Sequence, residues 1–600
     1  MSFLQQELAR LMKNERQREA YLWDDHCVVQ AGPGSGKTAV LALKIVRLLT
    51  EQIPAPRGLA CLTFNNEAVR EFRNRLKKMG LQPRTNVFLG TVHSFCLASV
   101  IKPFGKMFNP KLPFPFRVAS EKLRGKCLQK AMDKVGIKEP IWQFQTRFDR
   151  YRRTNLDRTC KEWLSDEESA EAIESYEAIL RSNGYIDFDD LILISLQIVE
   201  KEAFVQRCLS ARFPWIVVDE YQDLGYPLHR IIVNLMEKTD IKIFAVGDPD
   251  QSIYGFAGAD PKYLQELSQR GDVKPIRLEL NYRCGQKIIN GAEIILSPPS
   301  PRNYKSSRGN NEPGEIYFIE RSAGLESQAV MVVEEILPQL IKAGYEPKEI
   351  AILYIDRNDA NVITKVLDTK GIKYAGERDQ RYRRTPVTRW IEDSAQWCCG
   401  IAEKEGGRFK EILDFWTKLL AETKTPIRDE ELLLNMCYFF EALSPLRNAE
   451  TPLLKWLSEL DKNLSLRKRL SLLKEMPEEL ESFDLMLSAC QEGNPLAKFT
   501  VADLCGCGPN SNVLSLNTLH SSKGLQFDVV IIPGLEEGRL PSWSARSDHA
   551  LREARRTFYV GFTRARYLVY ILFSGWYENL RGVFENGPSR FVIELENALS

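Results

Sequence analysis

The sequence is poor in cysteine, has no long apolar run and carries almost no net charge. Its 13 cysteines among 600 residues are too few for a disulfide-stabilised scaffold, so we expect reduced thiols in a cytoplasmic protein. No apolar run approaches the roughly 20 residues of a membrane-spanning helix, and the N-terminal residues lack the pattern of a secretory signal. The 82 basic and 80 acidic side chains give no overall support for a nucleic-acid partner, although a local basic groove would be enough to bind one.

The remaining composition is typical of a multidomain globular protein. Hydrophobic residues make up 44% of the chain and charged residues 27%, which excludes a globally disordered or fibrous protein. At roughly 100–200 residues per domain, the length predicts about three to five domains.

Residues 31–38 follow the phosphate-loop pattern G-x-x-x-x-G-K-[ST], with alanine in place of its first glycine and Gly32 next to it. An apolar run at 27–30 predicts a buried strand before the loop, and residues 39–49 predict a helix after it, which is the context that the pattern requires. Loop amides and the positive helix end bind phosphates, Lys37 reaches the outer phosphates, and the Thr38 hydroxyl can ligate Mg²⁺. The predicted nucleotide loop consists of Gly32, Pro33, Gly34, Ser35, Gly36, Lys37 and Thr38.

The second part of the predicted nucleotide site lies at 215–220. There an apolar run, which predicts a strand, ends in two carboxylates. Asp219 suits a role in Mg²⁺ binding, and Glu220 suits a general base that polarises the attacking water. Two solvated carboxylates at a strand end are the alternative interpretation, which the nearby nucleotide pattern disfavours.

The segment between the phosphate loop and Asp219 is much longer than a connection within a compact α/β core. Strand-like runs at 59–63, 86–90, 216–219, 243–247 and 276–280 predict one parallel sheet. Because residues 101–183 have a helical pattern, we predict a helical subdomain inserted into an α/β core.

Polar and aromatic residues follow three of these strands, at the sheet edge where open α/β sheets bind ligands. After residue 247, Gln251 could sense a γ-phosphate, and two aromatic residues could stack on bases; such aromatics can also be core residues. A lone histidine at the end of another strand could likewise be purely structural. We predict a nucleic-acid track formed by Thr63, Phe64, Asn65, Thr91, His93, Ser94, Tyr254 and Phe256.

These segments together resemble the superfamily 1A DNA helicases of the UvrD, Rep and PcrA type. The resemblance covers about residues 14–573, except for about 110 residues near 395–510, and rests on an ordered series of motifs. These lie around Gln17 and at 62–68, 90–94, 186–191, 218–223, 247–258, 280–283, 517–528 and 555–566.

The resemblance implies two RecA-like parallel-sheet cores, each with a helical insertion. The first core would comprise 1–100 and 186–278 with its insertion at 101–185. The second would comprise 279–394 and 511–600 with a short insertion at 395–510. The resemblance also implies ATP and Mg²⁺ as cofactors and 3′→5′ movement on single-stranded DNA. Gln17 and Tyr282 would hold adenine, His520 would contact DNA, and the catalytic set would be Lys37, Glu220, Gln251, Arg283 and Arg564.

Three positions depart from the family pattern. Ala257 stands where many members have an arginine that links ATP to DNA, Gln526 replaces a glutamate, and Ala554 replaces another. With the short second insertion, Ala257 motivates an alternative function, a DNA-sensing ATPase subunit that acts through a nuclease in an antiviral defence complex. Partners expected from sequence are single-stranded DNA, junctions of single-stranded and duplex DNA, and a nuclease or repair protein; an RNA motor is a third option.

Overall fold

The computed structural model describes residues 2–600 except 64–65, 82–86, 159, 256–257, 310–311, 377–381, 383–384, 401–407, 423–428, 473–476, 495, 506–511 and 580–581. Two compact units divide the chain. The first comprises Met1–Phe318, Glu537–Val569 and Pro588–Ser600, and the second comprises Ile319–Glu536 and Tyr570–Gly587. Within the described residues, no helix combines the length and apolar character needed to cross a membrane.

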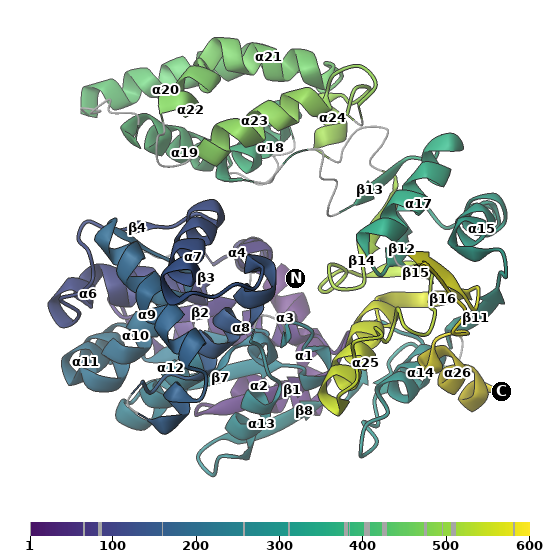
Figure 1. Cartoon of the computed structure of the whole chain (residues 1–600), viewed down its shortest axis with the longest axis horizontal. Helices are drawn as coiled ribbons and strands as arrows, with labels where there is room; N and C mark the ends of the chain where they lie inside the picture. Colours follow the sequence, from purple (N-terminus) through teal and green to yellow (C-terminus); the bar gives the residue numbers. More distant parts are fainter. Residues whose placement is uncertain are drawn as a thin grey trace. The chain divides into compact units, whose positions relative to one another are not determined.

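The first unit contains a six-stranded sheet in the order β3-β2-β6-β7-β1-β8 (Figure 1). Every neighbouring pair in it is parallel, which confirms the predicted parallel sheet. The strands are β1 (Cys27–Ala31), β2 (Leu59–Thr63), β3 (Phe88–Thr91), β6 (Trp215–Val218), β7 (Lys242–Gly247) and β8 (Lys274–Leu278).

Both faces of this sheet are covered, which explains why its strands are almost continuously apolar. Alternate residues of a strand point to opposite faces, so Val28 packs in one core cluster and Val29 in the other. The face of Val29 packs against α3 (Lys37–Arg47) and α4 (Asn66–Lys78), and the face of Val28 packs against α10 (Phe188–Lys201) and α12 (Tyr226–Lys238).

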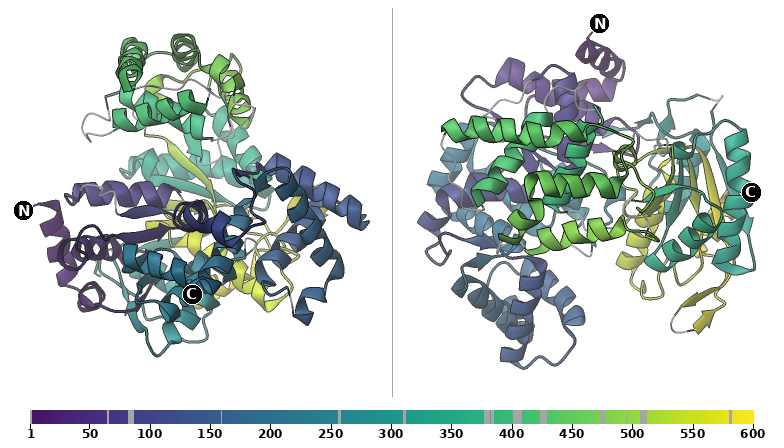
Figure 2. Two further views of the ribbon diagram at one scale, coloured as in Figure 1. Left: turned by 90° about the vertical axis from the view of Figure 1, so that its left-hand side faces the viewer. Right: turned by 90° about the horizontal axis from the view of Figure 1, so that it is seen from above.

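The segment between β3 and β6 is largely helical, as predicted. Helices α7 (Glu121–Val135), α8 (Ile141–Thr154) and α9 (Glu167–Ser182) enclose a separate apolar core around Phe144, Phe148 and Tyr176. Ser120 caps the start of α7, and Gly136 ends it with a left-handed φ of 88°, as expected for a helix C-terminus. Figure 2 shows this bundle in two further views, coloured blue.

The second sheet has the order β11-β16-β15-β12-β14-β13. Its central pairs, β12 with β14, β12 with β15 and β13 with β14, are parallel. The strands are β11 (Glu315–Glu320), β12 (Ile350–Tyr354), β13 (Tyr374–Gly376), β14 (Leu514–Thr518), β15 (Phe527–Ile532) and β16 (Ala565–Phe573). With the first sheet it bears out the fold class of two RecA-like cores.

A helix-rich stretch separates β13 from β14. Its core stacks Trp390, Trp416 and Phe439, with Trp390 and Trp416 ring centroids 5.9 Å apart. The main helices are α18 (Pro386–Cys398), α19 (Arg408–Glu422), α20 (Asp429–Leu443), α21 (Leu453–Leu464), α22 (Leu466–Leu472), α23 (Pro477–Ala489) and α24 (Val501–Leu504). The four-part domain boundaries stated above stay a prediction.

Candidate functional site

The phosphate loop leaves β1 in a conformation that only glycine adopts readily. Gly34 and Gly36 have φ of 67° and 83°, in the left-handed region. A Cβ on Gly34 would lie 2.5 Å from the Cβ of Arg283, and one on Gly36 would lie 2.8 Å from Nε2 of Gln17. Helix α3 begins at Lys37 rather than at the predicted residue 39, because Gly36 occupies the N-cap position.

The predicted adenine-binding residues lie on either side of this loop. The buried Gln17 donates a 2.8 Å hydrogen bond from Nε2 to the Ser35 carbonyl. Tyr282 donates its backbone N–H to the Gly34 carbonyl at 2.8 Å, and its hydroxyl accepts a 3.0 Å bond from Nδ2 of Asn14. The structure therefore brings Gln17 and Tyr282 to two consecutive residues of the phosphate loop.

Three cationic side chains, Lys37, Arg283 and Arg564, lie in the site around the loop. The Lys37 ammonium nitrogen is buried and has no hydrogen-bond partner within the described part of the chain. Arg283 donates to the Thr563 carbonyl at 3.3 Å, and Arg564 donates to the Val560 carbonyl at 2.7 Å. Burial, reinforced by the nearby Arg283, lowers the pKa of Arg564 to about 9. Buried cations gain stability from an anion, so this arrangement fits the phosphates of ATP.

The acidic side of the site follows β6. Asp219 is buried, and its backbone N–H continues the sheet by bonding to the Leu62 carbonyl at 2.9 Å. Glu220 is held at φ 51°, a strained conformation for a residue with a side chain. The Asp219 carboxylate and the Thr38 hydroxyl are oxygen donors of the kind that Mg²⁺ prefers.

The loop after β7 extends the site toward the sheet edge. Gln251 donates from Nε2 to Asp248 at 2.5 Å and accepts a 3.4 Å bond from Arg564. Burial raises the pKa of Asp248 to about 6, although the charge of Lys37 opposes this shift. The structure thus brings Gln251 and Arg564, two residues of the predicted catalytic set, within hydrogen-bond distance.

Helix α25 (Asp548–Phe562) holds the same loop from the other side. Arg556 donates to the Ser252 carbonyl at 2.6 Å, and Glu553 accepts the Gly255 backbone N–H at 2.9 Å. Tyr254 lies half-buried between these two anchor points. Phe256 and Ala257 lie outside the described residues, and their roles stay predictions.

The other predicted track residues lie at the ends of β2 and β3. Thr63 is buried, and Phe64 and Asn65 lie outside the described residues. Thr91 caps the short helix α5 (Val92–Phe95) by accepting the Ser94 N–H at 3.3 Å. Burial lowers the pKa of the half-buried His93, despite the nearby Asp189 carboxylate.

The comparisons with known proteins agree with this geometry. Residues 12–272 match the UvrD/REP helicase N-terminal domain, and residues 276–389 and 458–575 match the UvrD-like helicase C-terminal domain. The chain belongs to the UvrD/REP helicase family. Membership makes it an ATP-dependent DNA helicase.

Individual relatives cover almost the whole chain. It is 25% identical, over 653 aligned positions, to the ATP-dependent DNA helicase PcrA of Staphylococcus epidermidis, covering 99% of this chain and 87% of the relative. The PcrA of Staphylococcus aureus is 25% identical over 646 positions, covering 98% and 86%.

Phe188 is an exposed aromatic residue beside the predicted DNA track that the sequence motifs do not single out. Phe188 is 56% exposed, and its ring meets that of His93 edge to face, with centroids 6.0 Å apart. From the sequence, the motif at 186–191 supplies no predicted site residue. The pairing of its exposed aromatic ring with His93 follows from the packing of α10 beside α5, which no local pattern in the sequence encodes.

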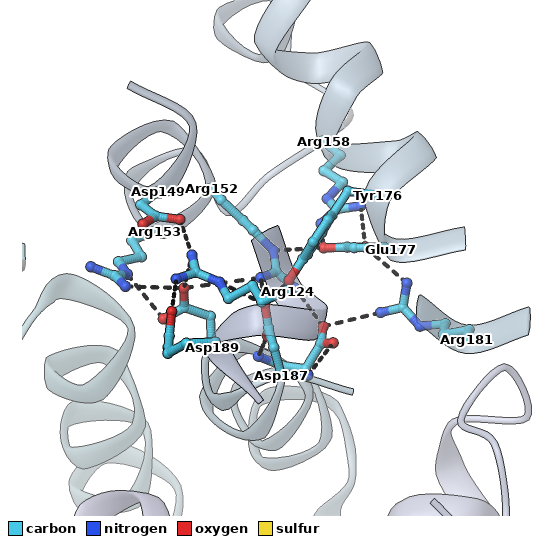
Figure 3. Close-up of polar contacts among 12 residues, drawn as sticks. Arg124, Asp149, Arg152, Arg153, Arg158, Tyr176, Glu177, Arg181, Asp187 and Asp189 are labelled. Carbon is cyan, nitrogen blue, oxygen red and sulfur yellow. Dashed lines mark hydrogen bonds and ion pairs between the residues drawn. The ribbon is translucent and has the colours of Figure 1, made fainter. Parts of the chain in front are cut away.

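A dense charged cluster lies at the N-terminus of α10, where Phe188 is the first residue of the helix (Figure 3). Asp187 and Asp190 form the capping box of α10 on either side of Phe188, and both accept bonds from the fully buried Arg152, at 2.7 and 2.6 Å. Arg152 also donates to Glu177 at 2.9 Å. The cluster consists of Arg124, Asp149, Arg152, Arg153, Arg158, Tyr176, Glu177, Arg181, Asp187, Asp189 and Asp190.

His520 belongs to the second unit, where it follows β14 and is half-buried. Gln526 is exposed just before β15, and Ala554 is half-buried on α25 of the first unit. The nucleotide residues described above, by contrast, all belong to the first unit, including Arg283 and Arg564 from the later motifs.

Proposed function

We propose that this helicase moves 3′→5′ on single-stranded DNA and couples ATP hydrolysis to duplex unwinding. The observation that carries the proposal is the buried Lys37 ammonium group, which has no hydrogen-bond partner among the described residues, together with the cations of Arg283 and Arg564 in the same site. Such a set is costly to bury unless a polyanion such as a triphosphate binds it.

The chain's own groups account for the hydrolytic step. Lys37 and the loop amides hold the outer phosphates, and Glu220 accepts a proton from the attacking water. Arg283, Arg564 and Gln251 stabilise the charge that develops on the transferred phosphoryl group. Thr38 and Asp219 would hold Mg²⁺, which neutralises phosphate charge when bound.

For the DNA track we propose Thr63, Phe64, Asn65, Thr91, His93, Ser94, Tyr254, Phe256 and His520, with Phe188 added. The 6.0 Å contact of Phe188 with His93 places an exposed aromatic face beside a predicted DNA contact. Aromatic stacking contributes roughly 1–3 kcal/mol per base. Junctions of single-stranded and duplex DNA are the substrates on which such a motor would act. The matching relatives are named as helicases and give no support to the nuclease-associated alternative.

The test is ATP-dependent unwinding of duplexes with either a 3′ or a 5′ single-stranded tail. The wild type should unwind only the 3′-tailed duplex. Lys37→Ala should reduce ATP turnover and unwinding by about 10²-fold or more, because a charge that stabilises the transition state is lost.

The matched control is Lys13→Ala, which removes an exposed lysine that follows α1 (Phe3–Met12) and should leave both activities unchanged. Unwinding from the 5′ tail alone would refute the proposed polarity. Unwinding that survives Lys37→Ala would remove the phosphate loop from the mechanism.

A further inference from the structure

Gln222 is a fully buried side chain to which the mechanism above gives no role. It lies two residues after Glu220, in the short helical turn Tyr221–Asp223. Both ends of its amide have protein partners, and these partners belong to the two segments that the proposed function links, the catalytic carboxylate and the loop after β7.

The orientation of the Gln222 amide follows from its partners. The backbone N–H of Asp248 can only donate, so the atom that faces it at 2.9 Å is the amide oxygen. The amide nitrogen must then point the other way, where it donates to the Glu220 carboxylate. The Gln222 amide nitrogen therefore fixes the direction in which the Glu220 carboxyl group points.

The loop is tied to Gln222 at a second point. The Ser252 hydroxyl donates to the Gln222 carbonyl at 3.1 Å, and the Ser252 carbonyl accepts the bond from Arg556 on α25. A Cβ on Gly247 would lie only 2.5 Å from the Gln222 amide oxygen. Only glycine at position 247 leaves room for the Gln222 amide beside the end of β7.

We propose that Gln222 is a positioning residue that sets the Glu220 carboxylate according to the position of loop 248–258. The loop carries Tyr254, a proposed DNA contact, two residues after Ser252. A displacement of the loop by DNA is therefore transmitted through Ser252 and the Asp248 N–H to Gln222, and from Gln222 to Glu220. The inference rests on the proposed role of Glu220 as the base.

Two substitutions of Gln222 test this link. Gln222→Met keeps the approximate volume and loses both hydrogen bonds; Gln222→Glu keeps an oxygen toward Asp248 and loses the donor toward Glu220. Both should lower the kcat of ATP hydrolysis at saturating single-stranded DNA by roughly 10- to 100-fold, the effect of losing a hydrogen bond to a charged group. The KM for ATP should change by less than about threefold, because a loss confined to the transition state leaves substrate binding intact.

The matched control is Gln206→Met on α11 (Ala203–Arg212). Gln206 is also a buried glutamine of the first unit, and its amide donates to the Val199 carbonyl at 2.7 Å. This variant should keep the wild-type kcat. Binding of fluorescent ADP, measured alongside, reports whether each variant retains a folded nucleotide site.

Glu220→Gln separates the two proposals. If Glu220→Gln keeps wild-type turnover, Glu220 is not the base, and the role of Gln222 falls with it. If Glu220→Gln abolishes turnover while both Gln222 variants keep kcat within about twofold of wild type, only the Gln222 proposal is overturned. A raised KM with unchanged kcat, or an equal loss in Gln206→Met, also overturns it.

Discussion

At the scale of single residues, the backbone at Glu220 is strained and its neighbours hold it in place. A left-handed conformation at a residue with a side chain costs on the order of 1–3 kcal/mol and persists only where the surroundings impose it. The next residue, Tyr221, is fully buried, and its hydroxyl meets Nδ1 of His229 at 2.9 Å. The buried side chains of Tyr221 and Gln222 thus hold the backbone in place immediately after Glu220.

His229 gives this anchor a pH dependence. Burial, with the nearby charges of Arg230 and Arg270, lowers the pKa of His229 to about 4 from 6.5. As pH falls below 6.5, the unfolded chain takes up a proton that the folded protein does not bind, so folding stability decreases down to about pH 4. Between pH 7.5 and 5.0 this site should cost about 2 kcal/mol of unfolding free energy.

Urea denaturation at the two pH values measures the loss. The control variant is His229→Gln, whose amide oxygen can accept the Tyr221 hydroxyl but does not titrate; its stability should fall by about 2 kcal/mol less over this range. The exposed Glu266 carboxylate lies 3.5 Å from Nε2 of His229. An equal pH dependence in both proteins would mean that this carboxylate stabilises a protonated histidine after all.

At the scale of elements, the N-terminus of α10 shows most clearly how one segment depends on several others. Its two capping carboxylates, Asp187 and Asp190, are neutralised by Arg152 from α8, and Arg181 from α9 adds a 3.3 Å bond to Asp190. A cation from one helix thus joins the inserted bundle to the helix that returns to the sheet. Phe188, between Asp187 and Asp190, takes its position from these contacts.

Removing the Arg152 cation should strongly destabilise the packing of the inserted bundle against α10. Arg152→Met leaves buried carboxylates without their charge partner, at a cost of about 3–5 kcal/mol, and the thermal midpoint of the first unit should fall by several degrees. Arg147→Met on the same helix is the matched control, since the Arg147 side chain is 42% exposed and such surface pairs contribute only about 0–1 kcal/mol. Equal midpoints in the two variants would show that the cluster does not hold the bundle to the core.

The sequence predicts these elements well but not their junctions. Apolar runs and the glycine pattern locate β1, β2 and the phosphate loop, because strand burial and loop geometry are encoded locally. The partners of Arg152 extend from Glu177 to Asp190. Gln222, which follows β6, accepts a hydrogen bond from the N–H of Asp248, which follows β7. No local pattern encodes such pairings, since they depend on how β6, β7 and the helices pack. For the same reason Asn14 beside Tyr282 and Phe188 beside His93 were not predicted.

At the scale of the whole molecule, the net charge of +2 agrees with the character of the proposed DNA track. The track residues that the structure describes are neutral hydroxyls and aromatic rings, and the lowered pKa of His93 favours its uncharged form. A motor must release each nucleotide that it binds, and binding through stacking leaves fewer phosphate contacts to break at every step than binding through charge.

This character predicts a weak salt dependence of single-stranded DNA binding. Each neutralised phosphate contributes about −0.7 to the slope of log affinity against log salt. With about four or fewer such contacts, affinity should fall by less than about 10²-fold between 50 and 200 mM salt. Phe188→Ala should weaken binding at every salt concentration by about 1–3 kcal/mol without changing the slope, because stacking releases no counterions. Fluorescence anisotropy with a labelled oligonucleotide measures both quantities. A slope near −6, unchanged affinity in Phe188→Ala, or a shallower slope in that variant would show that phosphate charge, not stacking, holds the strand.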